Sequence, residues 1–200
     1  MPSTNWPTNP AFTAVNFKIN TPVLSTNTLS GMTRRVAMGH SYYTLSAKYS
    51  NLSRAGYGTV AGYVSQLYGS LESFKIVIPE LSYTKVGLQT TNPVYTAGAN
   101  AVAGASSVAV TGVTSGRNLL AAGDFFRFNN HTKVYMCAVT WTTGQPLYFS
   151  GSLVKDVPSG TEIIINAVDF TMILDNNVQQ FDIGTGGITQ AQFDMKEVWL

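Results

Sequence analysis

Apolar residues recur at every second position over much of this chain, in runs too short to form helices. Val15, Phe17 and Ile19 alternate with polar residues, and the run from Tyr42 to Tyr49 repeats the pattern. Strict alternation of this kind is typical of a strand with one buried face. Apolar residues make up 44% of the 200 residues, which is enough to bury a core. The sequence therefore predicts a mainly β protein, built as one domain with an insertion or as two small domains.

One segment departs from this alternation, between Ser53 and Gly69. Its apolar residues follow the i, i+3, i+4, i+7 spacing of a helix with one buried face. They are Tyr57, Val60, Ala61, Val64, Leu67 and Tyr68. Asn51 or Ser53 can cap the first turn, and Gly69 suits the left-handed residue that ends a helix. The predicted fold class is thus α+β, mainly β with one principal helix.

Changes of composition divide the chain. Residues 1–11 contain three prolines and several Ser, Thr and Asn, so we interpret them as an arm that is extended or ordered only on a partner. Residues 92–118 are rich in small residues, and we place a domain boundary near residue 93. Short apolar runs separated by turn residues follow, at 125–128, 133–139, 147–150 and 162–166. Their regular spacing predicts a small β-barrel or sandwich.

Two further segments, 170–174 and 178–182, are separated by Asp175, Asn176 and Asn177. Residues of this type favour tight turns, so the sequence predicts a hairpin here. A last strand is expected over residues 191–200.

The charges are few and unevenly placed. Charged residues make up 11% of the chain, and twelve basic against ten acidic residues leave a net charge of +2. That charge is too small to predict nucleic-acid readout. The first acidic residue is Glu72, whereas the charged residues after position 160 are all acidic except Lys196. Either the two ends pair within one domain, or a basic face on one copy meets an acidic face on the next.

No catalytic, cofactor-binding or metal site is predicted, and we expect no enzyme activity. Cys137 is the only cysteine and lies in an apolar run, which predicts a buried thiol. His131 falls in a turn, and His40 has no carboxylate near it in the sequence. A zinc site needs three or four His, Cys or acidic ligands at short spacings, and the sequence has no such cluster. The glycine-rich segment at 184–187 leads into a strand, whereas a phosphate-binding loop leads into a helix. No signal peptide and no membrane-spanning run of ~18 apolar residues is visible.

Several segments resemble the distal tail and minor tail proteins of tailed bacteriophages. The stretch from Leu119 to Cys137 resembles a segment in which a Gly-Asp-aromatic strand precedes a short turn and a Lys-Val-Tyr strand. The run from Leu153 to Ile164 is similar to the closing part of the same module. The order Arg34-Arg35, strand, helix, Gly69 in the first half is similar too.

This resemblance implies a belt domain at 12–92 and 166–200 that carries an inserted β-barrel domain at 93–165. It also implies a function: six copies would form a hub ring in the virion, joining the tail tube to the tip or baseplate, with tail fibres as a further partner. Ring subunits meet through two different patches, head to tail. The separated charges supply candidate interface residues, namely Arg34, Arg35, Lys48, Arg54, Asp169, Asp175 and Asp182.

A second hypothesis comes from the aromatic residues, which make up 12% of the chain. A β-sandwich that binds carbohydrate at a host-recognition surface would use exposed aromatic side chains. The same residues are also expected in any β core.

Overall fold

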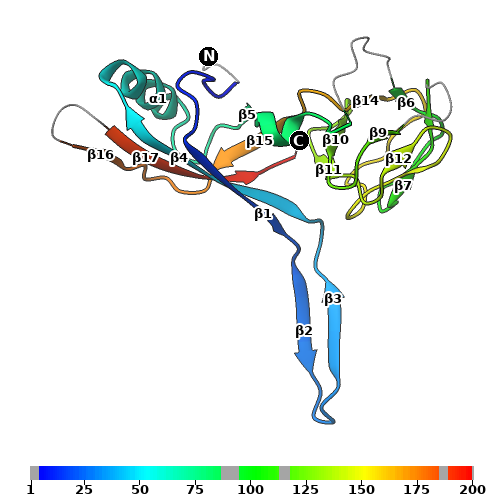
Figure 1. Ribbon diagram of the computed structural model, residues 1–200. Coiled ribbons are helices and arrows are strands. Elements are labelled where there is room, and N and C mark those ends of the chain that lie inside the picture. The colour runs from blue at the N-terminus through cyan, green and yellow to red at the C-terminus, as the bar shows by residue number, and fades with distance from the viewer. Residues whose placement is uncertain (1–4, 87–94, 113–117, 185–188, 200) are drawn as a thin grey trace. The chain divides into compact units, whose positions relative to one another are not determined.

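The computed structural model describes residues 5–86, 95–112, 118–184 and 189–199. The chain is mainly β with one principal helix, as the sequence predicts (Figure 1). It divides into two compact units, one formed by Met1–Lys75 with Met172–Val198 and the other by Ile76–Thr171 with Trp199–Leu200. The division predicted from the sequence, with an arm at 1–11, a belt at 12–92 and 166–200 and an insertion at 93–165, stays a prediction.

A six-stranded sheet, most of which belongs to the first unit, has the strand order β1-β4-β17-β15-β5, with β16 also beside β17. The pairs β1-β4, β4-β17, β17-β15 and β17-β16 are antiparallel. The bounds are β1 Ala14–Asn20, β4 Tyr42–Leu52, β5 Phe74–Val77, β15 Asp169–Leu174, β16 Phe181–Ile183 and β17 Thr189–Glu197. Alternation decides which side of this sheet is buried, because Tyr43, Leu45 and Ala47 are buried while Lys48 is exposed. The period of two in the sequence thus sets the inner and outer faces.

The helix α1, Arg54–Gln66, covers the buried face of this sheet (Figure 1). Ser53 caps it by accepting a hydrogen bond from the Gly56 amide at 3.2 Å, as the sequence suggests. Val60, Tyr63 and Val64 form its buried side. Gly69 follows with φ +68°, and a Cβ there would lie 2.9 Å from Asn177 Oδ1. Both the backbone angle and this close approach therefore require glycine.

The N-terminal segment is anchored on the first unit's own core. The Trp6 amide donates to the Lys75 carbonyl at 2.8 Å, and Asn5 forms a parallel bridge to Lys75. The Trp6 ring is buried against Tyr63 and Phe74 of the same unit. Residues 5 and 6 of the predicted arm are therefore ordered by contacts within the chain and need no partner.

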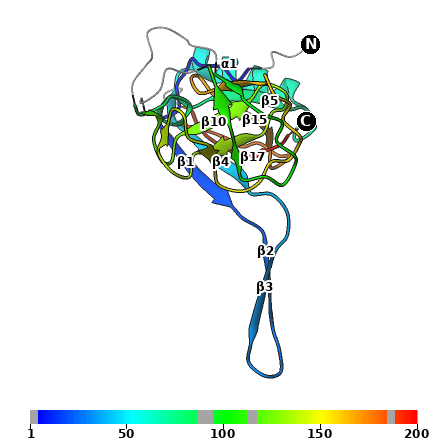
Figure 2. The same ribbon diagram turned by 90° about the vertical axis from the view of Figure 1, so that its right-hand side faces the viewer.

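The strands β2, Val23–Asn27, and β3, Thr33–Ala37, form a two-stranded hairpin between β1 and β4. The hairpin extends beyond the sheet in both views (Figure 1 and Figure 2). The hairpin predicted around Asn177 is not formed, since β15 and β16 both pair with β17. The backbone groups of the two strands find partners in the long central strand instead.

The second unit consists of short antiparallel strands. A five-stranded sheet has the order β11-β10-β14-β6-β8, and two strand pairs, β12-β9 and β13-β7, accompany it. The bounds are β6 Tyr95–Ala97, β7 Ser107–Val108, β8 Val110–Thr111, β9 Asn118–Leu120, β10 Phe125–Phe128, β11 Val134–Met136, β12 Trp141–Thr142, β13 Leu147–Tyr148 and β14 Glu162–Ile164. A four-residue helix, α2 Pro79–Ser82, belongs to the same unit and was not among the elements predicted from the sequence.

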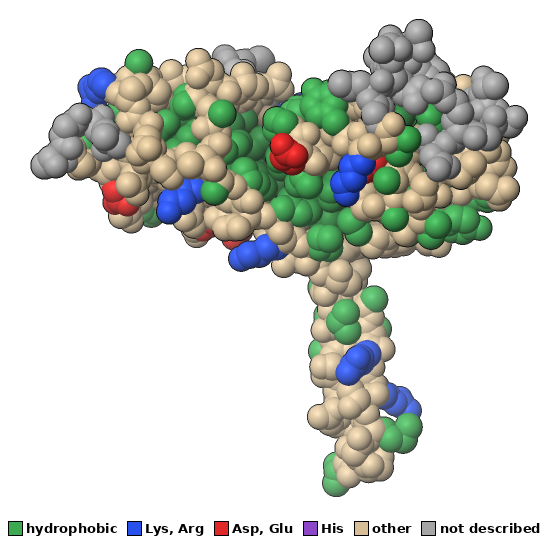
Figure 3. Space-filling model, in the orientation of Figure 1, with side chains coloured by type: hydrophobic (Ala, Val, Ile, Leu, Met, Phe, Trp, Pro, Cys, Tyr) green, Lys and Arg blue, Asp and Glu red, His purple; other side chains and the backbone are tan. Residues whose placement is uncertain are grey.

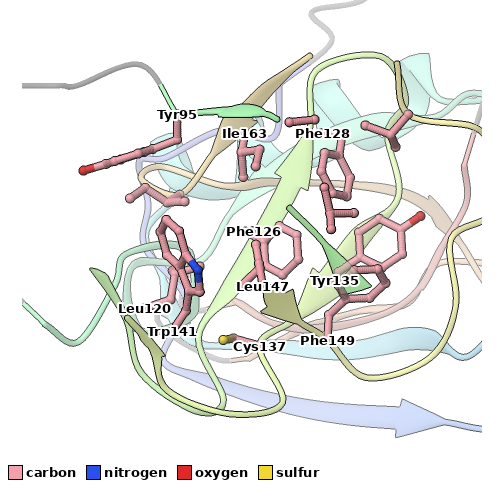
Figure 4. Packing of buried hydrophobic residues seen from close by; sticks show 14 of the residues in the cluster. Tyr95, Leu120, Phe126, Phe128, Tyr135, Cys137, Trp141, Leu147, Phe149 and Ile163 are labelled. Atoms are coloured by element: carbon pink, nitrogen blue, oxygen red, sulfur yellow. The ribbon is translucent and has the colours of Figure 1, made fainter. Parts of the chain in front are cut away.

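One apolar cluster forms the core of the second unit (Figure 4). Phe126 lies at its centre, with Tyr135 stacked on it at 5.9 Å between ring centroids. Cys137 is buried in the same cluster, which confirms the prediction of a core thiol. Burial raises the pKa of this thiol to about 11, so it is protonated and unreactive at neutral pH.

Candidate interaction surface

The β2–β3 hairpin is exposed on both faces. Its register places Leu24 opposite Val36 and Thr26 opposite Arg34, so these side chains share one face. Val23, Ser25 and Arg35 belong to the other face by the same register. Every residue of the two strands is exposed. Within the described part of the chain, therefore, neither face of the hairpin is covered.

Large apolar side chains are concentrated on this hairpin. The exposed ones are Val23, Leu24, Leu29, Met32, Val36 and Met38. Scattered exposed apolar residues are ordinary, but a contiguous group marks an interaction site. A two-stranded hairpin has no core of its own and is at best marginally stable in water. The hairpin is therefore the strongest candidate for a surface that another molecule covers.

The turn of the hairpin is held by its own hydrogen bonds. The Thr28 amide donates to the Met32 carbonyl at 2.9 Å, and the Gly31 amide donates to the Thr28 carbonyl at 2.9 Å. The Met32 amide also donates to Thr28 Oγ1 at 3.2 Å. Gly31 has φ +78°, a left-handed angle that glycine adopts without strain. These contacts fix the tip without help from the rest of the chain.

Arg34 and Arg35 are the only charged side chains among residues 22–39. The sequence predicts both as interface residues, and the structure places them exposed on β3, one on each face of the hairpin. Figure 3 shows apolar and basic side chains along the side of the hairpin in view. The surface thus combines apolar contact area with two positive charges, a combination suited to an acidic, partly apolar partner.

Two other predicted basic residues lie off the hairpin in the same unit. Lys48 is exposed on β4, opposite Gln192 of β17. Arg54 is exposed at the first position of α1, and its guanidinium lies 5.6 Å from the centre of the Tyr57 ring. Neither residue adjoins the exposed apolar group on β2 and β3.

The predicted acidic residues fall into two groups. Asp175 and Asp182 are exposed in the first unit, after β15 and in β16. Asp169 is different, because its Oδ1 accepts a 2.7 Å hydrogen bond from Arg127 Nε. The side chains of this ion pair are only 15% and 13% exposed. Asp169, the first residue of β15, and Arg127 both belong to the second unit, so the charge of Asp169 is already neutralised within that unit.

A buried histidine links two turns of the second unit. His131 Nδ1 lies 2.7 Å from Asn130 Oδ1, which can only accept, so Nδ1 carries the proton. Nε2 then accepts from the Tyr135 hydroxyl at 2.9 Å, and that hydroxyl accepts from the Val154 amide at 3.1 Å. Burial, with Lys155 and Arg127 nearby, lowers the pKa of His131 to about 4. His131 thus lies in a turn, as the sequence predicts, and its neutral imidazole is buried there and links that turn to Tyr135.

No group of three or more His, Cys, Asp or Glu side chains that could hold a metal ion occurs among the described residues. In the same part of the chain, no helix has the length and apolar character needed to cross a membrane.

Comparison with known proteins adds no assignment. No protein-family model matches the chain, and no curated protein matches it significantly. Any functional conclusion therefore rests on the residues and their arrangement.

Proposed function

We propose that this chain is a non-enzymatic structural component of a bacteriophage tail, a distal-tail-type subunit of the hub ring that joins the tail tube to the tip or baseplate. Its partners would be further copies of itself, the tail tube protein, the tip or baseplate hub proteins and tail fibres. The protein would make and break no covalent bond and would need no cofactor.

One observation carries the proposal: a hairpin whose apolar side chains are exposed on both faces. Such a ribbon has no apolar core of its own, so a partner that covers it, as in an assembled particle, adds the apolar burial that it lacks. The low proportion of charged residues, 11%, suits a surface that is extensively buried by neighbours. The resemblance of the Leu119–Cys137 and Leu153–Ile164 segments to tail proteins supplies the kind of particle.

Negative-stain electron microscopy of the purified protein, together with light scattering after size-exclusion chromatography, tests this proposal. We expect closed rings and the mass of a hexamer. A monomer at all concentrations contradicts the proposal. A monomer whose elution shifts with added glycan supports the carbohydrate-binding alternative instead.

A further inference from the structure

A second exposed surface of the first unit carries carboxylates, which the hairpin lacks, beside apolar side chains. It lies where the end of α1 meets the segment after β15, and Asn177 Oδ1 accepts hydrogen bonds there from the Ser70 hydroxyl at 2.7 Å and the Ser70 amide at 3.2 Å. Its exposed members, called the acidic patch below, are Tyr68, Leu71, Glu72, Asp175 and Val178. Each lies within two residues of Ser70 or Asn177, so they are neighbours in space.

This acidic patch is both apolar and negatively charged. Tyr68 is 76% exposed, Leu71 is 74% exposed and Val178 is 84% exposed. Glu72 and Asp175 contribute two carboxylates, and Asp182 of β16 adds a third along the same segment. Residues 67–74 and 175–184 contain no lysine or arginine. Nothing basic within these two segments neutralises the charge.

We infer that the hairpin of one copy docks on the acidic patch of a second copy. The hairpin offers apolar side chains with Arg34 and Arg35, and the patch offers apolar side chains with Glu72 and Asp175. Apolar contact would supply most of the stability, while the opposite charges would select the orientation and disfavour patch against patch. This inference rests on the proposed function, because it names the surfaces through which ring subunits would meet.

The positions of the two surfaces favour a head-to-tail assembly. The hairpin continues from β1 and β4, whereas the patch lies beside β15 and β16, further along the strand order of the same sheet. Both surfaces are exposed in the single chain, so the hairpin does not cover its own patch. Each copy can therefore donate one hairpin and accept another. Such a heterologous contact closes into a ring when the rotation between copies allows it.

A lipid surface is the main rival occupant of the hairpin. Protein segments that bind anionic membranes through their charge usually carry clusters of about four to eight basic residues. The hairpin has only two, and its apolar side chains are split between two faces. A second copy matches these features better than a membrane does, because a protein partner can contact both faces of the hairpin. Two carboxylates on that copy are enough to pair with Arg34 and Arg35.

A charge-exchange experiment tests the inference by sedimentation velocity. Variant A carries Arg34→Glu and Arg35→Glu, and variant B carries Glu72→Lys and Asp175→Lys. We expect each alone to self-associate about tenfold more weakly or worse, because like charges meet at the contact. A mixture of A and B should recover assembly, since each hairpin then finds a patch of opposite charge. All four positions are exposed, so folding should be retained, and circular dichroism checks this.

The matched control replaces two exposed lysines of the second unit, Lys85→Glu with Lys155→Glu, and should assemble like the wild type. If variants A and B both assemble as well as the wild type, the inference is wrong. It is also wrong if both fail to assemble and mixing them does not restore assembly. Neither outcome contradicts the proposal that the wild type forms a ring. A wild type that is monomeric throughout overturns the ring proposal and the inference together. A monomeric wild type that sediments with phosphatidylserine-containing vesicles identifies the lipid surface as the occupant.

Discussion

Trp6 donates a hydrogen bond from its indole Nε1 to the hydroxyl of Tyr49, across 3.0 Å and 43 residues of sequence. Burial raises the pKa of Tyr49, and the bond from Trp6 partly offsets that shift by stabilising the ionised form. The Trp6 ring is only 4% exposed and lies 5.5 Å from the Phe193 ring between centroids. A residue of the N-terminal segment therefore completes the core of the first unit.

Replacing Trp6 with alanine should destabilise the first unit by about 3 kcal/mol, because a large buried ring leaves a cavity. Urea unfolding followed by circular dichroism measures the loss. Trp6→Phe is the matched control: it keeps an aromatic ring but loses the bond to Tyr49, and should cost about 1 kcal/mol. Equal stability of the alanine variant and the wild type would mean that the segment is not anchored in solution.

The stability of the second unit should fall as the pH decreases from 6.5 toward 4. The pKa of His131 is about 4 in the folded chain against an ordinary value of 6.5, so the unfolded chain binds the proton more readily over this range. The favourable contribution is complete above pH 6.5, and about 3 kcal/mol is lost by pH 4. Denaturant unfolding at several pH values, compared with His131→Gln, isolates this effect from the titration of carboxylates. A difference between the two proteins that does not vary with pH contradicts the prediction.

Cys137 should react with a thiol reagent such as Ellman's reagent only after unfolding. Its side chain is buried and its pKa is raised to about 11, so the thiolate is both rare and inaccessible at pH 8. We expect no change in absorbance in buffer over an hour and one thiol per chain in guanidinium chloride. Rapid labelling of the native protein would show that this core opens readily.

A fragment of residues 93–165 should melt cooperatively, but at a lower temperature than a fragment of residues 76–171. The longer fragment retains the Arg127–Asp169 ion pair and the 2.7 Å hydrogen bond from Thr84 Oγ1 to Asp124 Oδ2. Asp124 is buried, so losing a partner is costly. Scanning calorimetry of the two fragments compares them. A shorter fragment without a cooperative transition would show that these contacts are needed for folding.

Cysteines placed at the hairpin tip and in the acidic patch, Leu29→Cys with Leu71→Cys, should form a disulfide between copies under mild oxidation. Cys137 is buried and does not compete. Non-reducing gel electrophoresis should show a ladder of multimers that collapses on reduction. The pair Leu29→Cys with Val139→Cys is the control, because Val139 is exposed in the second unit, outside the patch. An equal ladder from both pairs would indicate random collision.

Much of the architecture was accessible from periodicity. The alternation around Leu45 and the helical spacing around Val60 each specify a buried face, and both faces are buried in the structure. The hairpin predicted near Asn177 was wrong because turn residues report a change of direction and not the partner of the following strand. The bond between Arg127 and Asp169 joins residues 42 apart, and charge counting along the chain cannot detect such a contact.

The candidate surface was only partly predictable. The charge distribution indicates Arg34 and Arg35, but it does not indicate the apolar side chains beside them. A signal was present, since Leu24 and Val23 are both apolar and occupy opposite faces, which a half-buried strand does not require. The contact between Ser70 and Asn177, 107 residues apart, depends on the tertiary fold and left no mark in the sequence.

The hydrogen-bonded turn at Thr28–Met32 affects how fast subunits could join. Because this tip is already ordered in the free chain, docking would restrict few backbone angles and would incur little of the entropic cost that a segment folding on its partner incurs. Encounter would then resemble rigid insertion, with a rate set by diffusion and orientation. A preformed tip of this kind allows subunits to add one after another without a slow rearrangement at each step.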